Sequence, residues 1–437
     1  MLTEAMTSRL RPVLPNKPTL IAVLDVGSTK MCCLIARLTP RPEGKALKAR
    51  THVAEVLGFG YGASAGIKAG AVAELEPAEQ AVRAVVGMAE RTAGVTIQSI
   101  VVNISAGRLI SETFNATVAL DGHAVEAADL SRVLAAVNDR SVRDERAVLH
   151  AMPIGYTLDG RKGVRDPRGM VGDSLGVDVA VVSAETLAMR NLELVLNRCH
   201  LQVEAFVASP YASGLAALAD DEAELGVGCI DFGGATTTVS IFAEGHLVYA
   251  DAIAIGGHNI TLDLARQLSI SIDDAERLKT LHASVLPGQS DEREMVAITP
   301  VGSGDDEAPM QLSRATLTRI IRPRIEEILS VLRDRLQATG MMDLSGKRLV
   351  ITGGGSEMTG LPELARRIVA RNVRQGRPLG ISGLPPMAKG PAFSTVVGML
   401  IYPQVCAQEM IAPRVAGRLT GTDGYLSRVT GWLKSGF

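Results

Sequence analysis

The sequence predicts a two-lobed α/β fold whose lobes are related by internal duplication. A chain of 437 residues is too long for one compact core, so at least two lobes are expected. Its 46% apolar and 21% charged residues are typical of a globular α/β protein. A short acidic and glycine-rich motif occurs twice, because residues 24–30 align one by one on residues 230–236. Two related lobes can close two such motifs on one ligand.

Composition and charge argue against several classes of protein. A net charge of −2 gives no reason to expect nucleic acid as the main partner. The five cysteines form no Cys-x-x-Cys pair and the seven histidines show no metal-ligand spacing, which fits a reducing cytosol and no zinc site. Residues 1–18 carry prolines and arginines without an apolar core, so we expect a disordered N-terminus rather than a signal peptide. No apolar run is long enough to span a bilayer.

Residues 229–242 predict a strand, a glycine turn and a second strand. Gly233 and Gly234 lack a Cβ, so backbone N–H groups can surround an anion there. Asp231 at the strand end could hold Mg²⁺ directly or through water. Alone, the stretch also fits an ordinary hairpin. Neither copy is followed directly by a helix, which argues against a Rossmann site, and neither has P-loop spacing.

The first lobe begins with strands and one helix. Pro77 can occupy the first helical turn and Gly94 the position after the last, so they bracket an amphipathic helix. The expected strands are 19–27, 30–38, 52–61 and 97–104.

Residues 106–172 have a different character and predict a small inserted subdomain. They contain a helix with one apolar face, a strand at 148–156 and a charged Gly/Pro/Arg stretch at 159–172. The apolar face consists of Leu130, Val133, Leu134 and Val137. We expect a strand at 177–182 and a helix at 184–200 to return to the first lobe.

Two helices are expected after the second hairpin, at 260–268 and 273–282, the first preceded by Gly256 and Gly257. The second carries Glu276 and Lys279. A structural explanation for these residues is a capping box between Asp273 and Glu276 and an i,i+3 surface pair between Glu276 and Lys279.

A long helical pattern at 314–336 contains Pro323, which should break or kink it. A buried strand at 348–352 then ends in three glycines and Ser356, followed by a helix at 362–371. A simple strand–helix turn is an alternative for this glycine segment.

The C-terminal segment differs from the rest of the chain. Residues 412–422 resemble a linker because they contain Pro413, Gly417 and Gly421. Residues 423–437 predict a helix of roughly 22 Å, too short to span a bilayer. One stripe of this helix is apolar, and it comprises Tyr425, Leu426, Val429, Trp432, Leu433 and Phe437. The only tryptophan lies beside basic residues, so we expect a membrane-surface helix, with a docked terminal helix as the alternative.

In this order, the motifs resemble the phosphate and adenosine motifs of the actin/Hsp70-like ATPase superfamily. With the insert and the C-terminal helix, residues 19–437 are similar to the FtsA family of bacterial cell-division proteins. The resemblance implies an actin-like two-lobed ATPase fold with duplicated lobes, an FtsA-type 1C insert and a C-terminal amphipathic helix. Its divisions would be subdomain 1A (19–105 and 173–206), 1C (106–172), 2A (207–256 and 316–404), 2B (257–315), a linker (405–422) and a membrane-targeting helix (423–437).

The resemblance also implies a site for ATP and Mg²⁺ between the lobes. Asp25 and Asp231 would hold the metal, largely through water. The two phosphate loops would be Gly27, Ser28, Thr29 and Lys30, and Gly233, Gly234 and Thr236. The remaining nucleotide-binding positions would be Gly256, Gly257, Glu276 and Lys279, with Gly354, Gly355, Ser356 and Met358 around the base.

By the same resemblance, the protein would tether filaments of the tubulin-like division protein FtsZ, the Z ring, to the inner face of the cytoplasmic membrane at the division site. Subdomain 2B would receive the C-terminal peptide of FtsZ, with Arg319, Arg322 and Arg324 as candidates, although a solvated basic helix face explains them equally well. Filaments of the protein itself, and later division proteins bound by subdomain 1C, complete the expected partners.

Residues 208–216 resemble the connecting segment of the superfamily, with one departure. Ser209 stands where Hsp70-like members carry a glutamate that positions the attacking water, and a serine hydroxyl is a poor base. We therefore expect no catalytic residue and at most slow ATP hydrolysis. A small-molecule kinase of the same superfamily is the alternative, but it needs a carboxylate base that we cannot assign. A chaperone ATPase would need a peptide-binding domain, and none follows the core.

Overall fold

The computed structural model describes residues 10, 12–14, 16–41, 50–105, 108–138, 145–302, 309–345 and 347–409. The predicted membrane-targeting helix at 423–437 lies outside these residues, as does most of the predicted disordered N-terminus. Within that N-terminus, Leu10 is buried and its N–H donates to the carbonyl oxygen of Glu204 at 3.0 Å. This short part therefore packs on the first lobe.

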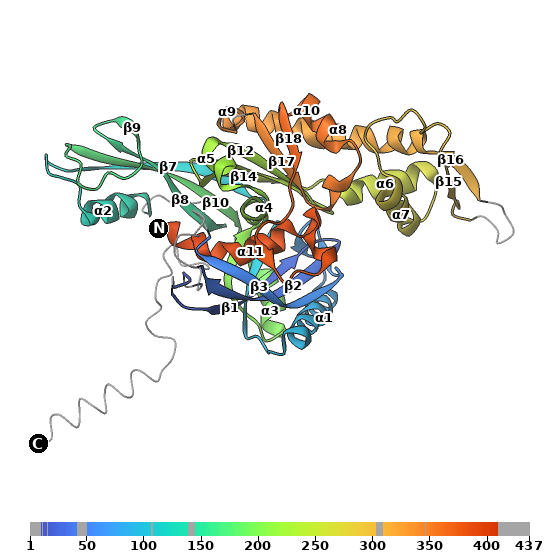
Figure 1. The fold of residues 1–437 in the computed structure, drawn as a ribbon, viewed down its shortest axis with the longest axis horizontal. Coiled ribbons are helices and arrows are strands. Elements are labelled where there is room, and N and C mark those ends of the chain that lie inside the picture. Colours follow the sequence, from blue (N-terminus) through green and yellow to red (C-terminus); the bar gives the residue numbers. More distant parts are fainter. Residues whose placement is uncertain are drawn as a thin grey trace, which may run out of the picture.

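Two sheets of matching topology form the two lobes (Figure 1). In each, a central strand pairs antiparallel with the next strand and parallel with a later one. The first sheet has the order β11-β6-β1-β2-β3-β19, made of β1 (Thr19–Val26), β2 (Lys30–Pro40), β3 (His52–Ala63), β6 (Ser99–Ile104), β11 (Gln202–Ala208) and β19 (Ile381–Ser382). The second has the order β14-β13-β12-β17-β18, made of β12 (Val227–Phe232), β13 (Thr237–Ala243), β14 (His246–Ile253), β17 (Arg348–Thr352) and β18 (Asn372–Gln375). The duplication predicted from the sequence is thus a duplication of sheet topology.

In the part of the chain that the structure describes, two helices join the lobes. Helix α4 (Ser209–Ala217) leads from β11 into the second lobe, and α11 (Ser394–Val405) returns to the first. They cross closely, because a Cβ on Gly398 would lie 1.7 Å from the carbonyl oxygen of Ala212. Because both helices connect the lobes, a movement of one lobe relative to the other would have to change the packing at this crossing.

The other helices of the first lobe are those expected. Helix α1 (Leu75–Ala93) packs against β3 and ends at Gly94, whose φ of 68° is left-handed. Helix α3 (Thr186–Arg198) precedes β11. The remaining short elements of the chain are β4 (Ile67–Lys68), β5 (Ala71–Val72), α5 (Asp220–Leu225), α9 (Met341–Leu344), α10 (Leu361–Ile368) and the 3-10 turns η1 (Gly354–Glu357), η2 (Pro386–Lys389), η3 (Pro391–Phe393) and η4 (Cys406–Gln408).

The insert is a four-stranded sheet with one covering helix, at one end of the molecule (Figure 1). Its sheet order is β7-β10-β8-β9, made of β7 (Ile110–Ala119), β8 (Arg146–Leu158), β9 (Arg161–Val164) and β10 (Ser174–Glu185), and its helix is α2 (Ala127–Asn138). Strand β10 was expected to return to the first lobe, but it pairs with both β7 and β8. The sheet of the insert therefore runs beyond residue 172, to Glu185.

The second lobe carries a helical arm at the opposite end of the molecule (Figure 1). It consists of α6 (Gly257–Leu268), α7 (Ile272–His282), α8 (Arg314–Ala338) and the hairpin of β15 (Met295–Ile298) and β16 (Met310–Ser313). Helix α8 runs unbroken through Pro323, so of the expected break or kink the break is wrong, and the kink stays a prediction. Pro323 has no N–H to donate to the carbonyl oxygen of Arg319, one turn earlier. Both residues are exposed, so water can bond to that oxygen instead.

Among the described residues, no helix is long and apolar enough to cross a membrane.

Candidate functional site

The two acidic–glycine hairpins face each other between the lobes. In each turn the first glycine donates its N–H to a carbonyl oxygen three residues on, from Gly27 to Lys30 at 3.1 Å and from Gly233 to Thr236 at 3.0 Å. A Cβ on Gly234 would lie 2.5 Å from the Thr29 methyl carbon. The hairpins therefore meet, and only glycine allows the approach. They border a cleft of about 520 Å³.

All but two of the predicted nucleotide-binding residues line this cleft; the exceptions are Gly256 and Ser356. A Cβ on Gly256 would lie 2.7 Å from the carbonyl oxygens of both Gly233 and Gly234, so this glycine supports the hairpin from beneath. Ser356 is buried and donates to the Gly353 carbonyl oxygen at 2.7 Å. Both residues therefore lie behind the cleft and contact residues that line it.

Asp25 is buried at the end of β1 and is held by Asn103 on β6. The Asn103 amide nitrogen donates to Asp25 Oδ1 at 2.8 Å and to Ser209 Oγ at 3.0 Å, and the Asn103 amide oxygen accepts from the Val26 N–H at 2.7 Å. Burial raises the pKa of Asp25 to about 6, although the nearby Lys30 ammonium opposes the shift. The sequence analysis did not identify Asn103, whose signal is a single amide in an apolar strand.

Asp231 occupies the equivalent position at the end of β12. Its Oδ2 accepts from the hydroxyls of Ser213 on α4 and of Thr395 on α11, the latter at 2.9 Å. Burial raises its pKa, and these hydrogen bonds oppose the shift. The two helices that join the lobes therefore both bond to a carboxylate of the cleft. Ser213 and Thr395 carried no signal in the sequence, because they reach Asp231 only through the fold.

Lys30 follows the first glycine turn and lies between the two carboxylates and the 3-10 turn η3. Its Nζ donates to the Ala392 carbonyl oxygen and lies 3.7 Å from the centre of the Phe393 ring. Burial lowers the pKa of its ammonium, while the charges of Asp25 and Asp231 oppose that shift.

Glu276 and Lys279 on α7 form the far wall. Lys279 Nζ donates to Glu276 Oε2 at 2.7 Å and to the Gly257 carbonyl oxygen at 3.1 Å. The predicted i,i+3 pair is thus confirmed. The predicted capping box is wrong, since the N-cap of α7 is Ser271, whose hydroxyl accepts from the Asp274 N–H at 3.0 Å. Glu276 is left to face the cleft.

The cleft offers the chemistry that a phosphorylated ligand with a divalent cation requires. Its glycine turns let a ligand approach the backbone, as phosphate-binding loops do. Two carboxylates with raised pKa values stand opposite one lysine, and a hard cation between them would favour their ionised forms. The described residues contain no cluster of three or more His, Cys, Asp or Glu side chains for an all-protein metal site. Any cation here would keep water or ligand oxygens.

The three candidate arginines on α8 differ in their surroundings. Arg324 is bidentate to Asp263, at 2.7 and 3.0 Å, and also pairs with Glu327 at 2.6 Å. Arg322 pairs with Glu326 at 2.7 Å. Arg319 is exposed and donates to the hydroxyl of Thr316. The charge of Arg324 is therefore largely used within the chain.

The predicted membrane-binding stripe, from Tyr425 to Phe437, lies outside the described residues and has no placement relative to the cleft.

Two family models match the chain. The model "Cell division protein FtsA" matches residues 228–398, and the model "SHS2 domain inserted in FTSA" matches residues 106–183. The second match spans the insert and includes most of β10, in agreement with the sheet pairing.

Solved structures of similar fold have low sequence identity. The chain in a PilM–PilN type IV pilus biogenesis complex matches with a TM-score of 0.60 and 16% identity, over 88% of this chain and 98% of that one. MreB5 of Spiroplasma citri bound to ADP matches with a TM-score of 0.52 and 13% identity, over 89% and 97%. These likenesses support the predicted actin-like, two-lobed fold.

Curated proteins match over nearly their full length. The cell division protein FtsA of Rhizobium meliloti is 54% identical over 98% of this chain and 97% of its own. That of Pseudomonas aeruginosa is 32% identical, over 96% and 98%. With this identity, the insert and the fold, the chain belongs to the FtsA family of cell division proteins.

Proposed function

We propose that the chain binds ATP with Mg²⁺ in the interlobe cleft and acts as an adaptor that attaches FtsZ filaments to the cytoplasmic membrane. The observation that carries the nucleotide part is the pair of matched hairpins meeting across one cavity. Family membership supports a role in cell division. Our proposal adds the bound nucleotide, the contact with FtsZ filaments and the contact with the membrane.

The phosphates would lie between the hairpins. The first would contribute Gly27, Ser28, Thr29 and Lys30, and the second Gly233, Gly234 and Thr236, all at the cleft surface. Lys30 supplies a positive charge, and the glycines admit the phosphate to the backbone N–H groups. The solved MreB5 structures of Spiroplasma citri are bound to ADP and to AMPPNP, which supports nucleotide binding by a chain of this fold.

Asp25 and Asp231 would hold Mg²⁺, largely through water. Both carboxylates are buried with raised pKa values, so a bound cation would recover the free energy lost by keeping them ionised. The metal would neutralise phosphate charge. The protein's own part is to fix the two carboxylates, through Asn103 on one side and Ser213 with Thr395 on the other.

The nucleoside would extend toward α7 and the glycine turn after β17. Glu276 and Lys279 would bond the ribose side, and Gly354, Gly355 and Met358 would border the base, since all five line the cleft. A Cβ on Gly355 would lie 2.9 Å from Phe232 Cβ, so this wall of the pocket also depends on glycine.

The partners would bind at the two ends of the molecule. Residues 257–315 of the helical arm (subdomain 2B) and the adjoining start of α8 would receive the FtsZ peptide through Arg319 and Arg322, since Arg324 is committed to Asp263. The insert (subdomain 1C) would meet later division proteins. The C-terminal helix would anchor filaments of the protein to the membrane surface, which would place it as a peripheral protein on the cytoplasmic side at the division site.

We propose that ATP turnover is slow and that the nucleotide mainly stabilises a closed, filament-forming state. Ser209 lines the cleft next to Asp25, and its hydroxyl already accepts from Asn103. A serine in that environment has no means of activating water. A small-molecule kinase is the alternative. It predicts rapid phosphoryl transfer to a small hydroxyl compound, which an adaptor would not perform.

The nucleotide site can be tested with Gly234→Val. Its side chain would collide with Thr29 and occupy the space between the hairpins, so calorimetry should detect no binding of ATP with Mg²⁺. Gly155→Val is the control, since a Cβ there meets nothing within 4 Å and affinity should not change. Unchanged affinity in a folded Gly234→Val protein would remove the second hairpin from the proposed site.

A further inference from the structure

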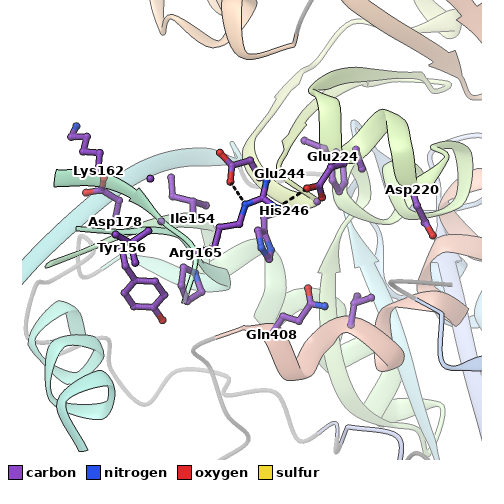
Figure 2. A pocket seen from close by; sticks show the side chains of 18 of the residues that line it. Ile154, Tyr156, Lys162, Arg165, Asp178, Asp220, Glu224, Glu244, His246 and Gln408 are labelled. Carbon is purple, nitrogen blue, oxygen red and sulfur yellow. Dashed lines mark ion pairs between the residues drawn. The ribbon is translucent and has the colours of Figure 1, made fainter. Parts of the chain in front are cut away.

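A second cavity, of about 490 Å³, lies where the insert, the second lobe and the end of α11 meet, and it shares no lining residue with the interlobe cleft. Figure 2 shows its walls: Tyr156 and Lys162 from the insert, Glu244 and His246 from the β13–β14 turn, and Gln408 from the turn after α11. Its volume is within the range of roughly 300–1,000 Å³ that is common for ligand-binding pockets.

The cavity has an apolar floor. Tyr211, Phe242 and Val405 line it and are each no more than 3% exposed, while Ile154 and Tyr156 are half-buried on the insert side. A ligand with apolar side chains would remove the exposed apolar surface of Ile154 and Tyr156 from water, above a floor that is already buried.

The rim of the cavity is acidic. Arg165 pairs with Glu224 at 3.0 Å and with Glu244 at 3.3 Å, as the dashed lines in Figure 2 show. The remaining charged residues of the lining are one lysine, Lys162, and two aspartates, Asp178 and Asp220. Burial lowers the pKa of His246, so its ring is neutral at pH 7 and does not offset the carboxylates. The charge of the rim therefore favours a basic ligand.

The C-terminal segment departs from the wall of this cavity. Gln408 lines it, and the next residue, Glu409, is buried and bonded to His150 through Nδ1 at 3.1 Å. The chain beyond Glu409 thus begins at a fixed point beside the opening. The 13 residues from 410 to 422 could span roughly 45 Å when extended, so residues 423–437 can reach the cavity.

We propose that this cavity binds the apolar stripe of the chain's own residues 423–437 whenever that segment is not on a membrane. The apolar floor would take some of the large side chains, Trp432 among them. Residues 410–437 contain four basic side chains and one acidic one, which complements the rim. Because the segment is tethered beside the cavity, its effective concentration there is high and a weak contact suffices.

The consequence is a competition between two sites for one stripe. In solution the cavity hides the stripe from other apolar surfaces, and at a membrane the lipid surface displaces it. The competition rests on the proposed membrane function, but docking itself does not.

Trp432 is the only tryptophan, so its fluorescence reports directly on the segment. In dilute protein without vesicles, quenching of Trp432 by acrylamide should be several-fold weaker than in the isolated 423–437 peptide. Asp178→Lys with Asp220→Lys should raise quenching toward the peptide value, and so should Arg428→Glu with Lys434→Glu. Combining all four substitutions should restore protection.

Glu76→Lys with Asp343→Lys, at exposed positions outside the cavity, is the matched control and should leave quenching unchanged. Tyr156→Ala reduces the apolar wall without altering charge and should also raise quenching. Melting curves establish that each variant is folded. Peptide-like quenching in the parent chain overturns the proposal. Protection that grows with protein concentration also overturns it, because the segment would then occupy a second copy.

Vesicles of anionic lipid separate this inference from the membrane function. The variant with reversed rim charges should bind them several-fold more tightly than the parent, because its stripe is no longer held. If Trp432 is exposed in solution while the parent binds vesicles, docking fails and the anchor stands. If Trp432 is protected but neither protein binds vesicles, docking stands and the anchor fails.

Discussion

Asp25 illustrates how a binding residue can cost stability before its ligand arrives. Burial raises its pKa from 3.8 to about 6, so the ligand-free folded chain holds a proton there more tightly than the unfolded chain does. The ionised form is therefore destabilising near pH 7, by about 3 kcal/mol at most. As the pH falls through 6 toward 4, this penalty disappears. A bound cation would remove it in another way, by favouring the carboxylate.

We therefore predict that Asp25→Asn stabilises the ligand-free protein by about 1–3 kcal/mol and weakens binding of ATP with Mg²⁺. The uncharged amide is not penalised by burial and can still accept from Asn103, but it gives the metal no charge. Urea unfolding and calorimetry measure the two effects, with exposed Asp121→Asn as the control. A destabilised Asp25→Asn protein would show that the attraction between the Asp25 carboxylate and the Lys30 ammonium outweighs the cost of burial.

Ser209 supports a second prediction at the scale of one residue. Steady-state phosphate release should fall far below the roughly 1–100 per second of kinases, because the Ser209 hydroxyl is a poor base and the proposed metal would engage the nearby Asp25 and Asp231 carboxylates. A rate in that range would favour the enzyme alternative. Ser209→Glu should raise the rate if the position matches the water-positioning glutamate of related ATPases. Its stability should also fall, since a second carboxylate would be buried near Asp25.

Much of the cleft could be predicted because its motifs are local. The glycine turns and their aspartates are each a few residues long. Asn103, Ser213 and Thr395 were missed because each meets its carboxylate from a distant part of the chain. A lone hydroxyl or amide in an apolar run is not informative until the fold defines its neighbour.

At the scale of elements, the last described part of the chain is fastened to the insert. His150 on β8 accepts from the Ala208 N–H at Nε2, at 2.9 Å, so its proton lies on Nδ1 and is donated to Glu409. His150 is fully buried, and its ring lies edge-on to Tyr211 and Tyr402. One histidine thus joins the insert, the start of α4 and the turn after α11.

We predict that His150→Ala destabilises the chain by about 3 kcal/mol, because it opens a cavity and leaves the Ala208 N–H and the buried Glu409 short of a partner. Urea unfolding measures the change. The half-exposed His282→Ala is the control and should change stability by less than about 1 kcal/mol. A cost for His150→Ala no larger than that of His282→Ala would mean that water replaces the lost bonds.

The sequence predicted which elements form more reliably than where they belong. The apolar residues of β10 indicate a buried strand in any sheet, so only the pairing with β7 and β8 could assign it to the insert. Helix α8 survives Pro323 because the lost backbone bond lies on an exposed face. Similarly, the cap of α7 was predicted at Asp273, whereas the helix begins after Ser271, two residues earlier.

At the scale of the whole molecule, attachment to a membrane should depend on assembly. Burying one large apolar side chain fully gains roughly 1.5–3 kcal/mol, and an interfacial helix buries each only in part. Ordering the segment costs roughly 1–2 kcal/mol of backbone entropy per residue. Docking in the second cavity would reduce the gain further. A lone protomer should therefore bind vesicles weakly and reversibly, whereas a filament presents many segments and multiplies their contacts.

We predict that vesicle binding strengthens as protein concentration, and hence polymer, rises, and that Trp432→Glu abolishes it while leaving ATP binding intact. Co-sedimentation with anionic vesicles measures both effects on vesicle binding, with a chain ending at Gly421 as the reference for complete loss. If Trp432→Glu still pellets with vesicles, the anchor lies elsewhere in the chain. If the isolated 423–437 peptide binds as tightly as the full protein at polymerising concentrations, attachment does not need assembly. ATP bound in the cleft should then affect membrane attachment through filament formation. If the nucleotide favours filaments, it should raise vesicle binding only at protein concentrations where the protein polymerises.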